Sequence, residues 1–173
     1  PSPPPAPFPP LETLHKLNVA SVSMSSLGVY NGGQTWPASQ CVDGDLDTLC
    51  AGKVNQNNPW FSIELRDGDS AGVVAIHNRG DQHSHYLNNF EVWVGPSPGW
   101  QSEGGTASMC GSGNAPANVG PFLVNCNGKP GKYVTLQLPG SMRFLTIAEM
   151  VVYGSIGTVH RPPPPPPLPS PPP

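Results

Sequence analysis

The chain has 173 residues, of which only 11% are charged, and its formal net charge is −3. An average protein has roughly 25% charged residues. The few Lys and Arg residues are scattered, so the sequence offers no basic stripe for nucleic acid. It also lacks an apolar run of the roughly 18 residues that a membrane-spanning helix needs. Roles in nucleic-acid binding or in membrane insertion are therefore not expected.

Proline-rich segments form both ends of the chain, at residues 1–10 and 158–173. Proline restricts φ and lacks the N–H that helices and sheets need, so both ends are predicted to form polyproline II. One domain, residues 11–157, is expected between them. Since the chain begins inside a proline tract, without Met or a signal peptide, we expect a mature or excised portion of a longer secreted product.

Short apolar runs separated by Gly, Pro and Asn fill the predicted domain. Residues 11–17 could make one helical turn, and residues 96–118 are expected to be a long loop. A helix is the alternative for the last apolar run, and no helix of three turns is visible. About eight short strands predict an all-β sandwich or jelly roll. The clearest expected strands are Leu17–Ser25, Trp60–Leu65, Val73–Ile76, Phe90–Val94, Phe122–Val124, Lys132–Leu138 and Phe144–Tyr153.

The four cysteines show neither CxxC pairs nor a His at zinc-finger spacing, so metal binding through sulfur is not expected. An even number of cysteines at moderate spacing is typical of disulfides in an oxidising, extracellular compartment. Three connectivities are possible. We prefer Cys41–Cys50 with Cys110–Cys126, because these pairs close the shortest loops.

An acidic turn contains Asp43, Asp45 and Asp47 at alternate positions around Gly44. The pattern begins like an EF-hand, but the Gly and Glu that such a loop needs later are missing. A different calcium site is possible, since calcium prefers several oxygen ligands. A solvated acidic turn is the alternative.

A polar segment, residues 78–86, separates two of the predicted strands and is expected at the surface, where binding groups are often displayed. Arg donors and aromatic rings suit the hydroxyls and the apolar face of a sugar. Alternatives are a transition-metal site at His83 and His85, a polar loop in which Arg79 and Asp81 pair, and an integrin-type Arg-Gly-Asp tripeptide. The candidate carbohydrate-binding residues are Arg79, His83, His85 and Tyr86.

Catalytic motifs are weak. Gly95 to Gly99 fits G-x-S-x-G, but prolines on both sides of Ser97 prevent the helix that a nucleophile elbow requires. Glu64 with Asp67 or Asp69 could form a glycosidase pair, yet no cleft is indicated. The sequence therefore predicts a domain that is not an enzyme.

Several motifs together resemble the F-type lectin (fucolectin) family of discoidin-like, F5/8 type C jelly rolls. They lie between about residues 18 and 154. The spaced cysteines Cys110 and Cys126 belong to the same pattern. The remaining motifs are VDGD at Val42–Asp45, NPWFSIEL at Asn58–Leu65, VVAIHNRGD at Val73–Asp81, LNNFEVWVG at Leu87–Gly95, GKYVTLQLPG at Gly131–Gly140 and LTIAEMVVYG at Leu145–Gly154.

The resemblance implies a structural calcium ion between the acidic turn and the last strand. Glu149, a lone carboxylate in an apolar strand, agrees with this, since a cation would compensate its burial. By position, the ligands would be the backbone oxygens of Gln40 and Ala148 and the side chains of Asp43, Asp45 and Glu149.

The family binds fucose through a His and two Arg residues. The first Arg corresponds to Arg79, the second falls on Tyr86, and no His precedes Asn58-Pro59-Trp60. Only one of the three fucose ligands is kept, so a site rebuilt from Arg79, His83, His85 and Tyr86 could bind another glycan instead.

The flanks resemble hydroxyproline-rich glycoproteins of plant and green-algal walls, in which prolines are hydroxylated and carry O-glycans. We therefore expect an extracellular structural glycoprotein of a cell wall, matrix or surface fibre. Its expected partners are glycans and neighbouring copies or other hydroxyproline-rich glycoproteins. The alternative is an architectural protein–protein spacer whose sugar site is degenerate.

Overall fold

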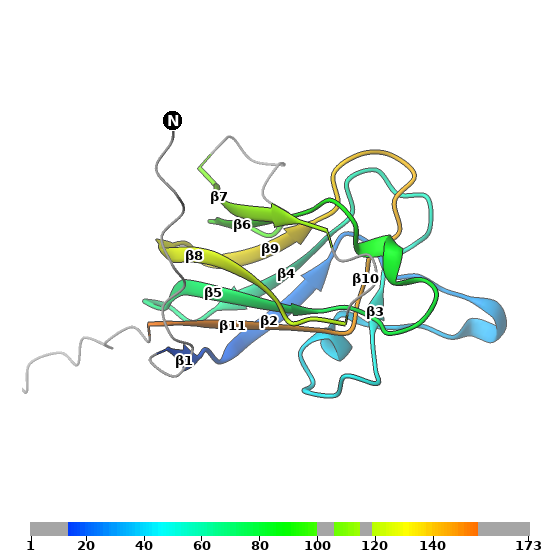
Figure 1. Ribbon diagram of the computed structural model, residues 1–173, viewed down its shortest axis with the longest axis horizontal. Coiled ribbons are helices and arrows are strands. Elements are labelled where there is room, and N and C mark those ends of the chain that lie inside the picture. Colours follow the sequence, from blue (N-terminus) through cyan, green and yellow to red (C-terminus); the bar gives the residue numbers. More distant parts are fainter. Residues whose placement is uncertain (1–13, 100–105, 115–118, 156–173) are drawn as a thin grey trace, which may run out of the picture.

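The computed structural model describes residues 14–99, 106–114 and 119–155. The two predicted polyproline segments lie outside the described residues. Two antiparallel sheets pack face to face, which confirms the predicted all-β sandwich (Figure 1). None of the described helices is long and apolar enough to cross a membrane.

Each sheet joins strands that are distant in sequence. The first contains, in spatial order, β1 (His15–Lys16), β11 (Glu149–Ser155), β5 (Ser70–His77) and β8 (Phe122–Pro130). The second contains β2 (Val19–Met24), β4 (Trp60–Leu65), β9 (Tyr133–Gln137), β6 (Phe90–Gly95) and β7 (Ser108–Gly113). A small pair is formed by β3 (Cys50–Ala51) and β10 (Thr146–Ile147), and short 3-10 turns are η2 (Asn31–Gly33), η3 (Ala38–Cys41) and η4 (Ser84–Leu87).

The apolar core lies between the two sheets. Phe61, Ile63 and Leu65 of β4 are buried, as their alternation predicts. The polar residue between them, Ser62, is buried as well. Its hydroxyl lies 2.6 Å from that of Thr135, and the backbone N–H of Gly99 donates to it from a covering loop. The outer face of this sheet is therefore partly covered, which alternation alone does not predict.

Three local expectations were wrong. The described part of residues 11–17 contains strand β1 instead of a helical turn. The predicted loop 96–118 contains β7, which pairs with β6 along the sheet edge. The last apolar run forms two strands, β10 and β11, separated at Ala148, so neither one continuous strand nor a helix is present. Phe144 precedes both strands and belongs to a loop.

Both predicted disulfides are confirmed. Cys41–Cys50 ties η3 to β3, and Cys110–Cys126 joins β7 of one sheet to β8 of the other. The described residues contain no free cysteine. The second bridge thus links the two sheets at their edges.

The strand register defines two ends of the sandwich. At one end β5 finishes at His77, which pairs with Glu149, and the chain enters the loop that contains Arg79. At the other end Ser70 pairs with Ser155, and His15 of β1 pairs with Gly154. The chain therefore enters and leaves the described domain at the end opposite the Arg79 loop (Figure 1).

Candidate functional site

The Arg79 loop, residues 78–88, connects β5 to β6 and is held by its own hydrogen bonds. The Asn78 side chain donates to the Ser84 carbonyl at 2.8 Å and accepts from the Arg79 N–H at 2.8 Å. Asp81 accepts from the His83 N–H at 3.0 Å. These bonds fix the loop into the turn that ends in η4, so its side chains are presented in one arrangement.

Arg79 and Asp81 form a bidentate ion pair, with Nε and Nη2 each 2.6 Å from a carboxylate oxygen. The Arg79 hydrogen bond lowers the pKa of Asp81 to about 2. The Arg79 side chain is only 16% exposed, whereas that of Asp81 is 51% exposed. The ion pair between Arg79 and Asp81, one of the alternatives predicted for this segment, is thus confirmed. Because a guanidinium has five N–H donors, the pair orients Arg79 while leaving donors for a ligand.

Aromatic rings from three segments line the same cavity as this guanidinium. The rings of Tyr30 and Trp36 lie 4.4 Å apart, and Tyr30 lies 5.9 Å from Phe144. Phe144 in turn lies 5.0 Å from Tyr86, on which the His83 ring stacks at 5.3 Å. Burial raises the pKa of the Tyr30 phenol, and the charge of Arg79 opposes this effect. The rings form a nearly continuous aromatic wall next to Arg79.

A cavity of about 230 Å³, here called the Arg79 pocket, is bounded by this wall. Three of the four predicted sugar-binding residues line it: Arg79, His83 and Tyr86. The other lining residues are Tyr30, Trp36, Leu49, Ala51 and Phe144. A cationic donor, several ring faces and a small apolar floor are brought together here.

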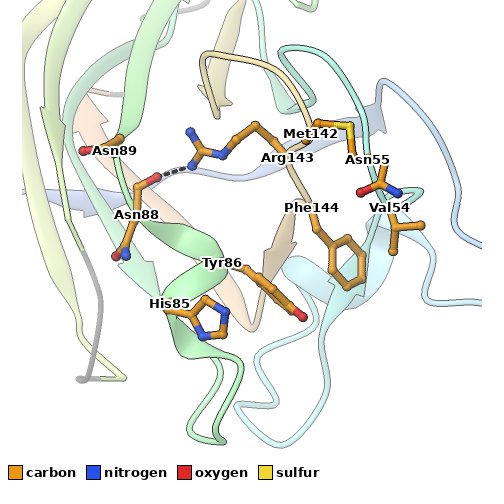
Figure 2. Close-up of a pocket in the computed structure, with 9 residues that line it drawn as sticks. All are labelled: Val54, Asn55, His85, Tyr86, Asn88, Asn89, Met142, Arg143 and Phe144. Carbon is orange, nitrogen blue, oxygen red and sulfur yellow. Dashed lines mark hydrogen bonds between the residues drawn. The ribbon is translucent and has the colours of Figure 1, made fainter.

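His85, whose ring lies 4.5 Å from that of Tyr86, lines a second cavity of about 440 Å³, here called the Arg143 pocket (Figure 2). Tyr86 and Phe144 line both pockets and stand between them. His85 therefore lines a different pocket from Arg79 and His83, although all four predicted residues lie in one loop. The other residues of the Arg143 pocket are Val54, Asn55, Asn88, Asn89, Met142 and Arg143.

Sequence reasoning missed the contributions of Tyr30, Trp36 and Phe144. The first two lie in the connection between β2 and β3, and Phe144 lies just before β10. Large aromatic side chains in a Gly-rich connection were the available signal for the first two, since such residues are rarely left in loops without a contact. Their convergence depends on strand order, which the local pattern does not give.

The acidic turn lies against Glu149, as the resemblance implies. The Gly44 N–H donates to Glu149 at 3.3 Å. Glu149 is 3% exposed, and burial raises its pKa, to which the charge of Asp43 adds. Asp43 accepts hydrogen bonds from the Asp45 N–H and the Thr48 hydroxyl.

The donor set at this turn suits calcium chemically, since all its groups offer oxygen. The side-chain oxygen of Gln40 is buried and has no hydrogen-bond partner among the described residues. Within those residues, no group of three or more His, Cys, Asp and Glu side chains is arranged to hold a metal ion. The transition-metal alternative at His83 and His85, whose rings are 6.3 Å apart, therefore gains no third such side chain within the described part of the chain.

Known proteins share this fold. The family described as NedA-like, galactose-binding domain matches residues 40–136. The pentraxin fusion protein of Xenopus laevis is 29% identical over 127 residues, which cover 70% of this chain and 30% of that protein. The chain thus spans less than a third of that relative's length.

Solved structures of lectins and carbohydrate-binding modules superimpose on the chain. The serum fucolectin of striped bass, Morone saxatilis, has 26% identity and a TM-score of 0.67, covering 81% of this chain and 49% of that one. The fucose binding module SpX-3 of Streptococcus pneumoniae has 21% identity and a TM-score of 0.64, covering 83% and 100%. The family 32 module of C. perfringens NanJ, solved with galactose, has 19% identity and a TM-score of 0.60, covering 83% and 96%.

At identities below 25%, the last two show likeness of fold alone. The family match covers more than half of the chain. Matches of this kind are lectins and binding modules, in agreement with the prediction that the domain is not an enzyme. The two disulfides are typical of a secreted protein. This chain belongs to the family of NedA-like, galactose-binding domains, within the discoidin-like, F5/8 type C fold.

Proposed function

We propose that this domain binds carbohydrate and that the Arg79 pocket holds one sugar unit. The observation that carries the proposal is the placement of Arg79, oriented by Asp81, beside the faces of Tyr86 and Phe144. A guanidinium donates hydrogen bonds to sugar hydroxyls, while an aromatic ring packs against the apolar face of a pyranose. The fold neighbours include modules described as binding fucose or solved with galactose, which supports the same ligand class.

A glycan array that includes fucosylated, galactosylated and arabinosylated glycans tests this proposal. Arg79→Ala should abolish binding to every glycan recognised by the native domain. Arg66→Ala is the matched control, because Arg66 is exposed in the turn after β4, at the opposite end of the sandwich. Binding that survives Arg79→Ala, or no binding by the native protein, contradicts the proposal. In the second case the architectural spacer becomes the better hypothesis.

The sugar specificity is expected to differ from that of fucose binders. Tyr86 stands where the resemblance places their second Arg, and its ring packs on Phe144 and His83. Replacing a cationic donor with a ring favours a ligand that presents a larger apolar face and fewer paired hydroxyls at this point. Comparing fucose with galactose and arabinose on the array tests this specificity.

The wider role we propose is that of an extracellular structural glycoprotein module in a cell wall, matrix or surface fibre. The proline-rich flanks of the sequence support it. Glycans on neighbouring copies, or on other hydroxyproline-rich glycoproteins, would be its ligands. Mass spectrometry of the native protein for hydroxyproline and its O-glycans tests this role; unmodified prolines contradict it.

A structural calcium ion is a further part of this proposal. Asp43, Asp45 and Glu149 would bind it through their side chains, and Gln40 and Ala148 through their backbone oxygens. The ion would supply positive charge at the buried Glu149 carboxylate, which has no ion-pair partner among the described residues. Its effect would be to fix the acidic turn against the first sheet.

A further inference from the structure

Arg143 is held firmly at the wall of the second pocket. Its backbone forms two hydrogen bonds with that of Gln56, at 2.9 and 2.8 Å. Its Nη1 group donates to the Pro139 carbonyl at 2.7 Å, and its Nη2 group donates to the Asn88 carbonyl (Figure 2). These two bonds leave other N–H groups of the guanidinium available for a ligand. The side chain is therefore positioned before any ligand arrives.

The charge of Arg143 is not balanced locally. Its two hydrogen-bond acceptors are neutral carbonyl oxygens, and none of the ion pairs among the described residues includes it. The residues that line the Arg143 pocket include no Asp or Glu. Burial lowers the pKa of Arg143, and no acidic group offsets this effect. Arg79, by contrast, is neutralised by Asp81.

A partly buried guanidinium without a carboxylate favours an anionic ligand. Desolvated charges are costly unless they are paired, and Arg binds carboxylate and sulfate-like groups through two parallel N–H donors. The pocket also offers the amides of Asn55 and Asn89 and the ring of His85. Its volume of about 440 Å³ lies in the usual range for small-ligand sites.

The backbone of this pocket is strained in a way that often marks function. Five non-glycine residues of the described chain have positive φ, and three of them line the pocket: Asn55 at 57°, Asn89 at 51° and Met142 at 55°. Asn adopts this region at modest cost, but for Met it is unfavourable. Met142 is also 69% exposed, so burial of its side chain does not explain the conformation. Such strain clusters at binding sites.

We propose that the Arg143 pocket binds an anionic group, the carboxylate of a uronic acid or a sulfate ester, on the sugar unit next to the one in the Arg79 pocket. This inference rests on the proposed carbohydrate binding. Tyr86 and Phe144 line both pockets, so one oligosaccharide can cross their rings with a unit on either side. The ligand is thus an acidic oligosaccharide rather than a single neutral sugar.

Arg143 also has a structural effect, because it links the loop before β10 to the Arg79 loop. A purely structural role would make Arg143 variants lose affinity for neutral and acidic glycans alike. A ligand-binding role makes the loss specific to the acidic glycan. The ratio of the two affinities therefore separates the roles.

The test is calorimetric titration with three oligosaccharides that bear the same galactose-containing core and, on the adjacent unit, a uronic acid, a sulfate or neither. We expect the preferred acidic glycan to bind about tenfold more tightly than the neutral one. That preference should shrink as salt is added, because it depends on charge. Arg143→Gln should weaken binding of the acidic glycan about tenfold more than binding of the neutral one, so that the preference disappears.

Two further variants sharpen the test. Arg143→Lys keeps the charge without the planar fork and should retain part of the preference. Arg66→Gln, at the far end, should retain all of it. The inference is overturned if the native domain binds neutral and acidic glycans with equal affinity. It is also overturned if Arg143→Gln loses affinity for both glycans equally. Either result leaves the proposed function intact. No binding of any oligosaccharide overturns both. A preference limited to sulfate or to carboxylate supports the inference and identifies the group.

Discussion

Tyr86 and Phe144 come from loops 58 residues apart in sequence, yet their ring centroids lie 5.0 Å apart and both rings line the two pockets. Tyr86 is positioned by the Arg79 loop, whereas Phe144 directly follows the residue that pairs with Gln56. The ridge they form is where a bound glycan would pass from one pocket to the other.

Replacing Phe144 tests this ridge directly. Phe144→Ala should weaken glycan binding about tenfold, since a well-placed aromatic contact contributes about 1 kcal/mol beyond its buried area. Phe144→Tyr preserves the ring and should bind like the native domain. Isothermal titration of both variants with the best array ligand provides the measurement. If the Ala and Tyr variants bind with equal affinity, the ring of Phe144 does not contact the glycan.

The ion pair with Arg79 should make the Asp81 carboxyl titrate at an unusually low pH. The pKa of Asp81 is lowered from 3.8 to about 2. Because the folded value is depressed, the stability that the pair contributes is present above pH 3.8 and is lost as the pH falls through about 2. NMR titration of the Asp81 carboxyl carbon should give the low value in the native domain. In Arg79→Gln it should return towards 3.8; an unchanged titration contradicts the pairing.

Calcium should stabilise the domain through Glu149. We expect the melting temperature of the native domain to fall by several degrees in chelator, because a ligand that binds only the folded state stabilises it. Glu149→Gln should melt at the same temperature with and without calcium. Asp69→Asn, in the turn at the opposite end, is the control and should respond like the native domain. A native melt that chelator leaves unchanged contradicts the calcium proposal.

The bridge between the sheets should be important for stability. Cys110 and Cys126 are separated by 16 residues, and closing such a loop stabilises a fold by about 3 kcal/mol. The double variant Cys110→Ser with Cys126→Ser should therefore melt about 10 °C lower in thermal denaturation. The corresponding variant at Cys41 and Cys50, separated by 9 residues, should lose slightly less from loop closure. A double variant with native melting behaviour contradicts this account.

The local pattern predicted those strands whose apolar residues face the core. Trp60–Leu65 was predicted with its observed bounds, because alternating Phe61, Ile63 and Leu65 give a clear period of two. Strand β7, Ser108–Gly113, was missed because Ser and Gly have low strand preference. It becomes a strand through its pairing with β6 and its disulfide to β8.

The candidate site was predictable only as far as one loop could reveal it. Arg79, His83 and Tyr86 share the Arg79 loop, so composition alone brought them together. Trp36 and Phe144 join them through strand order, which no local pattern encodes. The separation of His85 from Arg79 results from the 3-10 turn η4, which turns successive side chains to different faces.

The pairing of β1 with β11 has a mechanical consequence. His15 pairs with Gly154 and Lys16 with Tyr153, so a force applied to both ends of the described domain pulls two antiparallel strands apart from their shared end. Their hydrogen bonds would then break one after another instead of all together. The chain would therefore extend at low force by detaching β1 from β11. The two pockets, at the opposite end of the sandwich, would keep their structure during this extension.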